Sequence, residues 1–436
     1  MGRNNRRQAV LVAAGHLFND FYNSLLIPIL PILVSELRIS LTMAGAVVST
    51  LSVTTSLLQP VFGWLVDRRP RLWILALSLA WITTLMTLTG FAPHYGIFLF
   101  MVGMAGLGSA IYHPLGSVMM TRAVGGRKSL AMSIYTSIGN FGEALVPLIA
   151  TPVAMALGLK GLVSLAAPGL ILAWLIFRAY RREKALEAGG DDGFSAREAG
   201  KAPVVEVPAA GAQVTEAQAM EAQTVEAQVV GTQAAPPSTA SSRRSWLWVA
   251  VLDLVLILRS AVHISLIGFL PVYLVQRGYS NVAAGQILFA FMAAAALGIP
   301  FAGLLADRYG RKPVMLFSLA GAFGFISLFL AFDGALGVVM LALAGALILA
   351  SLPLAVVAAQ EMFPARAGMA SGLMMGFAWG IGGLGATVTG ALSDAFGVAA
   401  ALHIMIWLLL PAAALVAFLP SHVSLPESAP VRATGA

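Results

Sequence analysis

The segment Gly303–Lys312 reads GLLADRYGRK and joins two long apolar segments of the chain. An earlier segment, Gly63–Arg71, reads GWLVDRRPR and joins two other apolar segments. Each copy has a glycine followed four residues later by an Asp-Arg pair, and Pro70 stands in the earlier copy where the later one has Gly310. A short charged loop that recurs between apolar segments predicts a membrane protein with an internal repeat.

The two loops are 240 residues apart, and the same separation relates other residues of the two halves. It pairs Pro31 with Pro271, Gly45 with Gly285 and Pro60 with Pro300, while a separation of 239 pairs Pro114 with Pro353 and Arg127 with Arg366. The chain is therefore predicted to contain two copies of one structural unit.

The composition indicates how often the chain crosses the membrane. Hydrophobic residues make up 59% of the 436 residues and charged residues 10%, whereas a soluble domain has about a quarter charged residues. A helical crossing needs about 20 apolar residues, and segments of this kind span 9–35, 43–66, 72–91, 95–120, 130–155, 161–179, 246–275, 282–306, 313–332, 335–360, 368–392 and 398–419. We expect an all-α integral membrane protein with 12 transmembrane helices in two six-helix repeats. The absence of cysteine excludes disulfides and thiolate metal sites.

The sequence divides into four parts. Residues 1–180 and 246–420 each predict a six-helix bundle, and 421–436 a cytoplasmic tail. Residues 181–245 are rich in Ala, Gln, Glu, Thr and Pro and poor in aromatic residues, so we expect a flexible cytoplasmic linker. Most Lys and Arg residues lie at the two ends and in alternate loops, which predicts that both termini are cytoplasmic.

The loop Gly303–Lys312 resembles the loop signature of the major facilitator superfamily, and Gly63–Arg71 resembles a degraded copy of it. His16 and Asp20, Leu30-Pro31 and Tyr112-His113-Pro114 look like the fosmidomycin-resistance type of exporter within that superfamily. The segment 139–147 (GNFGEALVP) is similar to the helix-5 motif of its antiporters, although Glu143 replaces a small or apolar residue. The resemblance implies the major facilitator fold, alternating access, a monomer, and a central cavity that helices 1, 4, 5 and 7 line.

The repeated charges of the two loops suggest a gate. Asp67 and Asp307 can each lie near the positive N-terminus of a helix from the other half, with Arg122 and Arg366 as ion partners. The predicted gate residues are Gly63, Asp67, Arg68, Arg122, Arg127, Gly303, Asp307, Arg308, Arg311 and Arg366. Simple retention of charge at the membrane surface is the alternative.

Polar residues form a stripe in the first predicted helix. His16, Asn19, Asp20 and Asn23 follow helical spacing and share one face. Ionisable residues inside a bilayer are costly and usually face a cavity. We therefore predict that Asp20 carries the coupled proton, with His16 as its hydrogen-bond partner or a second proton site and Glu143 as a further coupling residue. A buried structural hydrogen bond is the alternative.

The equivalent stripe in the seventh helix carries a cation. Arg259, Ser260 and His263 lie 240 residues after Asn19, Asp20 and Asn23. Arg259 is expected to pair with Asp20 or Glu143, to bind an anionic substrate, or to alternate between them. The predicted substrate-binding set is Asn19, Asn23, Tyr112, His113, Asn140, Arg259, His263 and Trp379.

Three functions are compatible with these residues. The first is a secondary active transporter that exchanges protons for a small organic molecule or antibiotic resembling fosmidomycin. The second is a proton-coupled symporter that takes up an organic anion. The third is an intramembrane metalloenzyme using His16, Asp20, His113 and Glu143. The phosphate-binding loop GxxxxGK[ST] does not occur, which argues against direct use of ATP. We expect a bacterial inner-membrane transporter rather than an enzyme, with no cofactor, no metal and no nucleic-acid partner.

Overall fold

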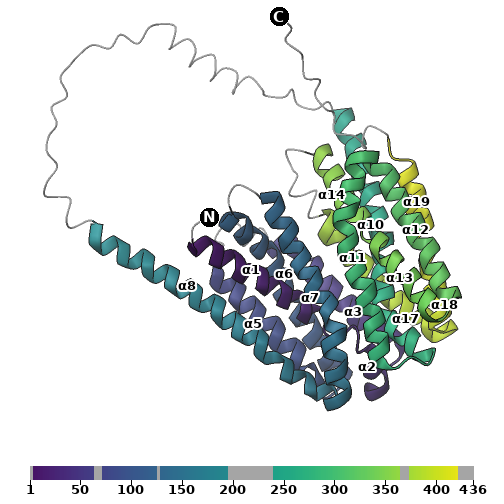
Figure 1. Ribbon diagram of the computed structural model, residues 1–436, viewed down its shortest axis with the longest axis horizontal. Helices are drawn as coiled ribbons and strands as arrows, with labels where there is room; N and C mark the ends of the chain where they lie inside the picture. The colour runs from purple at the N-terminus through teal and green to yellow at the C-terminus, as the bar shows by residue number, and fades with distance from the viewer. Residues whose placement is uncertain (1–2, 63–70, 125–127, 195–238, 364–372, 421–436) are drawn as a thin grey trace, which may run out of the picture. The chain divides into compact units, whose positions relative to one another are not determined.

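The computed structural model describes residues 3–62, 71–124, 128–194, 239–363 and 373–420, and these residues form helices and short connections (Figure 1). The chain forms two compact units, one of Met1–Tyr180 with Trp248–Ala436 and one of Arg181–Leu247. The larger unit contains the membrane helices.

The first half contains α1 (Arg3–Asn23), α2 (Leu30–Leu37), α3 (Leu41–Ser56), α5 (Leu72–Leu88), α6 (Tyr95–Val124), α7 (Lys128–Leu157) and α8 (Ala166–Phe194), with short 3-10 helices at Thr89–Phe91 and Leu159–Leu165. The second half contains α10 (Thr239–Gln276), α11 (Asn281–Tyr309), α12 (Arg311–Ala331), α13 (Gly334–Ile348), α14 (Ser351–Met362), a π-helix at Leu373–Phe377, α16 (Ala378–Gly383), α17 (Gly385–Phe396), α18 (Val398–Ile406) and α19 (Leu409–Ala417).

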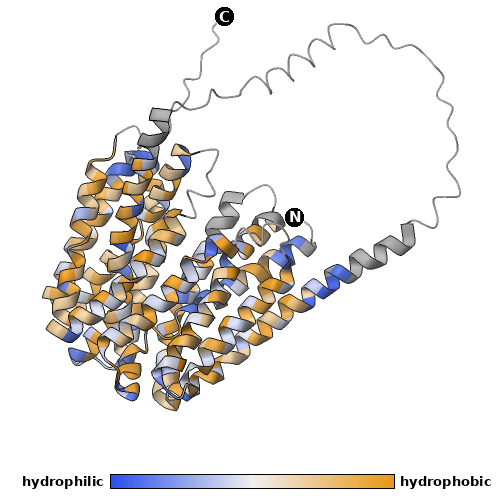
Figure 2. Ribbon diagram, turned by 180° about the vertical axis from the view of Figure 1, so that it is seen from behind, coloured by the Kyte–Doolittle hydropathy of each residue, from blue (hydrophilic) through white to orange (hydrophobic). Residues whose placement is uncertain are grey.

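Eleven helical segments of the described chain are long and apolar enough to cross a membrane, and each overlaps one of the predicted spans. Figure 2 shows hydrophobic residues over most of these helices. The remaining predicted span, 9–35, is divided into α1 and α2. Pro28 and Pro31 follow the end of α1, and Pro31 lies in the first turn of α2. Proline cannot donate a backbone hydrogen bond, which favours a break at this point and a new helix start.

Residues related by the internal repeat make equivalent contacts between the halves. Gly45 of α3 lies against the backbone of Ala386 in α17, where a Cβ atom would overlap the Ala386 carbonyl. Its counterpart Gly285 of α11 lies against α7, where a Cβ atom would be 3.0 Å from the carbonyl oxygen of Pro147. The two glycines therefore let one helix of each half approach a helix of the other.

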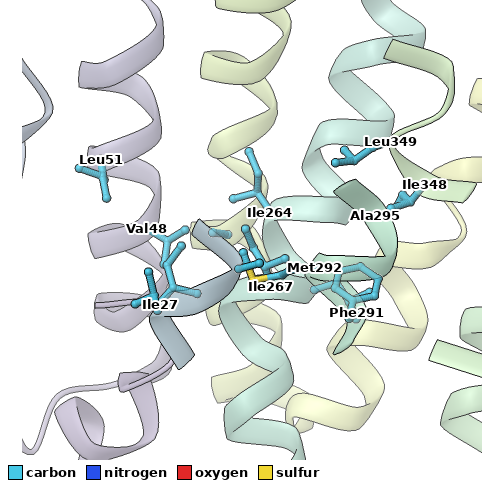
Figure 3. Packing of buried hydrophobic residues seen from close by; sticks show 14 of the residues in the cluster. Ile27, Val48, Leu51, Ile264, Ile267, Phe291, Met292, Ala295, Ile348 and Leu349 are labelled. Carbon is cyan, nitrogen blue, oxygen red and sulfur yellow. The ribbon is translucent and has the colours of Figure 1, made fainter. Parts of the chain in front are cut away.

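Apolar side chains from both halves pack beside these crossings. Figure 3 shows Val48 and Leu51 of α3 near Ile264 and Ile267 of α10, followed by Phe291 of α11. All five side chains are buried. In a bilayer such helix contacts depend on close van der Waals packing rather than on the hydrophobic effect.

Two domain boundaries differ from the helix ends. Helix α8 continues to Phe194 and α10 begins at Thr239, so both extend into the segment 181–245 that the sequence predicts as a linker. The remainder of that segment, 195–238, lies outside the described residues. The division of the membrane part into two separate six-helix domains stays a prediction.

Candidate functional site

Three ionisable side chains from α1 and α6 lie in direct contact. The Nε2 atom of His16 is 3.2 Å from Oδ2 of Asp20 and 3.2 Å from Nδ1 of His113. The Nε2 atom of His113 is 3.5 Å from Oδ1 of Asp20. His16 is buried, and Asp20 and His113 are partly buried. We call His16, Asp20 and His113 the His-Asp-His cluster.

The contacts within the cluster need more hydrogen-bond donors than two neutral histidines provide. The Nδ1 atom of His16 lies 2.7 Å from the carbonyl oxygen of Tyr135, which only accepts, so neutral His16 carries its proton on Nδ1. Its Nε2 lone pair then faces the carboxylate of Asp20. A second proton on His16 makes Nε2 a donor to Asp20 and to His113, and leaves the His113 proton free to face the other carboxylate oxygen. One added proton therefore supplies a donor for every contact in the cluster.

Small residues allow the three helices to meet at this point. Gly139 of α7 lies against the side chains of Asp20 and His16, with no space for a Cβ atom. Gly15 of α1 lies equally close to the hydroxyl of Tyr112, which donates to the carbonyl oxygen of Val12 at 2.9 Å. The His16 ring stacks on the ring of Tyr135, with centroids 3.9 Å apart.

The ligand atoms of His16, Asp20 and His113 all lie within 4.8 Å of one another, which is also close enough for one metal ion. One added proton on His16 explains the short contacts among these three side chains without a metal ion.

The other polar residues predicted on α1 bind neighbouring side chains. Asn19 donates from Nδ2 to Asp20 and to Ser109 of α6, both at 3.0 Å. Asn23 accepts from the hydroxyl of Thr55 of α3 at 3.0 Å. These contacts hold the stripe of α1 against α3 and α6.

Glu143 of α7 lies apart from the cluster contacts. Its Oε1 atom accepts a hydrogen bond from the hydroxyl of Ser24 at 3.0 Å. Ser24 lies four residues after Asp20 in the sequence, so Glu143 is about one helical turn away from the cluster. Asn140 is partly buried on the preceding turn of α7.

Arg259 of α10 is fully buried and has no hydrogen-bond partner among the described residues. Its exposed fraction is 0%, and none of its three side-chain nitrogen atoms is bonded there. Its guanidinium carbon lies 5.3 Å from the ring centre of Trp379 in α16. His263, one turn along α10, has its ring centre 5.7 Å from that of Trp379, and its Nδ1 atom is unpaired in the same part of the chain. These residues form the arginine cluster: Arg259, His263 and Trp379.

The two predicted carboxylate partners of Arg259 are engaged elsewhere. Asp20 contacts His16, and Glu143 contacts Ser24. Within the described residues no ion pair joins Arg259 to either carboxylate. A buried guanidinium attracted only by an aromatic ring retains its capacity for a bidentate contact with an anion.

Only part of the predicted gate can be placed. Asp307 and Arg308 are exposed at the end of α11, and Arg311 binds Glu361 through two hydrogen bonds, with Nη2 2.6 Å from Oε1. Gly303 has open space where a Cβ atom would lie. The residues Gly63, Asp67, Arg68, Arg127 and Arg366, and the side chain of Arg122, lie outside the described part of the chain.

Sequence reasoning missed several partners. Tyr135 contacts His16 through its backbone carbonyl oxygen. Every residue has such a carbonyl, so the residue type does not predict this contact. Ser24 and Thr55 are hydroxyl partners of Glu143 and Asn23. Asp394 of α17 binds the start of α3 in the other half. Asp394 lies in the last turn of α17, where the helix dipole disfavours an acidic residue. This unfavourable position could have indicated from the sequence that Asp394 has a partner elsewhere.

Comparisons with known proteins agree with this architecture. The chain is 29% identical to the fosmidomycin resistance protein of Escherichia coli (strain K12) over 388 residues, covering 88% of this chain and 85% of that protein. It is 31% identical to the uncharacterized MFS-type transporter YfnC of Bacillus subtilis (strain 168) over 426 residues, covering 96% of this chain and 94% of that protein.

Solved structures share the fold. A bacterial homolog of the human lysosomal transporter Spinster, in an inward-facing and occupied conformation, matches with a TM-score of 0.73 at 13% identity, covering 98% of this chain and 100% of that one. The nucleoside transporter NupG matches with a TM-score of 0.64 at 14% identity, covering 95% of this chain and 99% of that one.

The sequence model described as Major Facilitator Superfamily matches residues 12–290 and 252–435. Together with the apolar helices and the paired signature loops, this match shows that the chain is a multi-pass membrane transporter, not an enzyme, and that it belongs to the major facilitator superfamily.

Proposed function

We propose that the chain is a proton-coupled antiporter that exports a small organic molecule with an anionic group by alternating access. The observation that carries this proposal is the His-Asp-His cluster, in which the contacts of His16, Asp20 and His113 require one added proton. A group of side chains that gains and loses one proton between two conformations can couple transport to a proton gradient.

The substrate side of the proposal rests on the arginine cluster. An unpaired guanidinium in a water-poor interior is costly, and an anionic group of the substrate would offset that cost with two parallel hydrogen bonds. Trp379 and Phe291 flank His263 and provide apolar contact for the organic part. Asn19, Asn23, Tyr112, His113 and Asn140 are the proposed polar contacts from the first half.

Fosmidomycin is the first compound to test, because a relative that is 29% identical is named for resistance to it. We assign proton coupling to Asp20, His16 and Glu143. We place the protein in the bacterial inner membrane as a monomer, with both termini in the cytoplasm because the basic loops favour that side.

The second candidate function is proton-coupled uptake of an organic anion. The arginine cluster favours an anion without favouring a direction of transport. Antiport and symport predict proton movement in opposite directions when the same substrate gradient is imposed. One assay therefore separates them.

The test uses purified protein in liposomes that contain a pH-sensitive dye. Fosmidomycin added outside should make the interior alkaline in antiport and acidic in symport. Asp20→Asn should abolish the substrate-dependent signal, because the neutral amide neither exchanges a proton nor attracts the added proton of His16 with a negative charge. Asp253→Asn is the matched control, since Asp253 is a buried carboxylate of α10 outside the cluster.

Each result of the assay has a defined meaning. A signal that survives in Asp20→Asn, or is lost equally in Asp253→Asn, would contradict the assignment of coupling to the cluster. A signal lost on addition of a chelator would indicate metal binding at the cluster instead of proton binding. The absence of any proton signal during measured fosmidomycin transport would refute proton coupling.

A further inference from the structure

An apolar groove lies on the surface of the second half, away from both polar clusters. Helices α11, α12 and α13 enclose it, and its volume is about 470 Å³. Its lining includes Leu297, Phe301, Leu305, Phe317, Val339 and Leu343. Among the described residues, no charged side chain lines it.

Small residues form the floor of the groove and large residues form its rim. Gly298 of α11 packs against the backbone of Ala346 in α13, with no space for a Cβ atom. The rim residues Leu297, Phe301 and Phe317 are 66%, 64% and 61% exposed. Since these helices cross the membrane, such large apolar side chains face lipid. The groove therefore opens toward the acyl chains of the bilayer.

An exposed cation, Arg308, follows the lining residues along α11. Arg308 follows the lining residue Leu305 by three positions on α11, so the two share a helix face. Arg308 is exposed, and its guanidinium carbon lies 5.3 Å from the ring centre of Tyr309. In the described part of the chain no carboxylate forms an ion pair with it. Asp307 is adjacent in sequence but lies about 100° further around the helix.

The two neighbouring basic residues, Arg311 and Lys312, already have hydrogen-bond partners within the chain. Arg311 binds Glu361, and the ammonium group of Lys312 donates to the carbonyl oxygen of Leu419 at 2.6 Å. Of these three basic residues, Arg308 is thus the one available to a ligand that lies in the groove.

We infer that the groove binds an anionic phospholipid, with one acyl chain between α11, α12 and α13 and the phosphate on Arg308. An acyl chain alone gains little by leaving the bilayer for an apolar groove. The charge of the headgroup selects the ligand, because each basic residue at the membrane surface favours an anionic lipid by about fivefold. A bound lipid would stabilise α11 at the end that carries the signature loop.

Native mass spectrometry of the detergent-purified full chain tests this inference. The probes are phosphatidylglycerol and phosphatidylcholine with identical oleoyl chains. The wild type should bind phosphatidylglycerol about fivefold more tightly. Arg308→Gln should reduce its binding to the level of phosphatidylcholine.

The matched control is Arg178→Gln. Arg178 is an exposed arginine of α8 whose guanidinium carbon lies 5.2 Å from the ring centre of Trp174, and it does not line the groove. This variant should keep the preference of the wild type. Ala342→Phe places a large side chain in the groove and should weaken binding of both lipids.

Three results would overturn the inference. They are equal binding of the two lipids by the wild type, an unchanged preference in Arg308→Gln, and an equal loss of preference in Arg178→Gln. Arg308 is exposed, so we expect Arg308→Gln to fold. The comparison of this variant with the wild type therefore tests the inference even if Ala342→Phe does not fold.

Discussion

The carboxylate of Asp394 binds the first turn of the helix that begins at Leu41. Its Oδ1 atom accepts a hydrogen bond from the backbone nitrogen of Leu41 at 2.8 Å. Its Oδ2 atom accepts from the backbone nitrogen and the hydroxyl of Thr42, at 2.8 and 2.6 Å. Asp394 belongs to α17 and Leu41 to α3, so a carboxylate of one half stabilises a helix N-terminus of the other.

We predict that Asp394→Asn loosens this contact. Solvent screens the charge of Asp394 at this exposed position, so its hydrogen bonds contribute roughly 1 kcal/mol. Asparagine would also turn one acceptor into a donor that faces backbone N–H groups. The halves should separate more often at this end. Because the chain has no cysteine, Val48→Cys provides one labelling site between α3 and the second half, where Val48 lies close to Gly268. A water-soluble maleimide should react about fivefold faster when Asp394→Asn is added, which is the ratio that about 1 kcal/mol gives.

Asp333→Asn is the control for this prediction. Asp333 pairs with Arg277 at 2.8 Å, and both residues belong to the second half. Its neutralisation should leave the labelling rate of Val48→Cys unchanged. Equal rates in all three backgrounds would show that the Asp394 contact does not hold the halves together.

The fold followed from the sequence because its signals are local and repeated. Apolar length predicted twelve spans, and eleven of them overlap apolar helices of the described residues. The paired loops near Asp67 and Asp307 predicted the repeat. The division of 9–35 into α1 and α2 was missed, because apolar residues continue across Pro28. A hydropathy pattern records burial in lipid but not the backbone break that a proline introduces.

The site was predictable only in part. Helical spacing brought His16 and Asp20 to one face, and His113 of α6, which the sequence assigned to the substrate-binding set, lies 3.2 Å from His16. The decisive acceptor is the backbone carbonyl of Tyr135, which depends on the packing of α7 against α1. The sequence left open whether Arg259 pairs with Asp20 or Glu143 or binds an anionic substrate, because its neighbours depend on the tertiary structure. Among the described residues Arg259 has no hydrogen-bond partner.

Gly139→Ala should disrupt proton coupling through packing. The added methyl group would overlap the Asp20 carboxylate and the His16 ring, so the cluster must separate. We expect substrate-dependent proton flux to fall tenfold or more, which corresponds to a cost of about 1.4 kcal/mol or more for displacing the two side chains. The liposome dye assay measures this flux. Gly324→Ala is the control, since a Cβ atom at Gly324 meets open space, and the same loss in both variants would refute the packing explanation.

Glu143→Gln distinguishes a coupling residue from a structural one. Glutamine keeps an oxygen that can accept from Ser24 at the 3.0 Å contact, but it cannot release a proton. If Glu143 couples transport, the variant should lower proton flux per substrate molecule, whereas Ser24→Ala should leave that ratio unchanged. Parallel measurements of substrate and proton flux provide the ratio. Identical ratios in the wild type and Glu143→Gln would assign Glu143 a structural role.

Arg259→Met tests whether the buried arginine serves the substrate or the fold. Methionine fills much of the same space without a charge, and an unpaired buried charge is unfavourable. We therefore expect the thermal unfolding midpoint in detergent to stay the same or to rise. Transport of fosmidomycin should fall at least tenfold, because a charge-assisted pair with an anion contributes roughly 1.5–3 kcal/mol. A marked fall in the midpoint would identify a structural arginine. Arg277→Met is the control, because Arg277 is exposed and paired with Asp333 at 2.8 Å, and its removal should leave fosmidomycin transport intact.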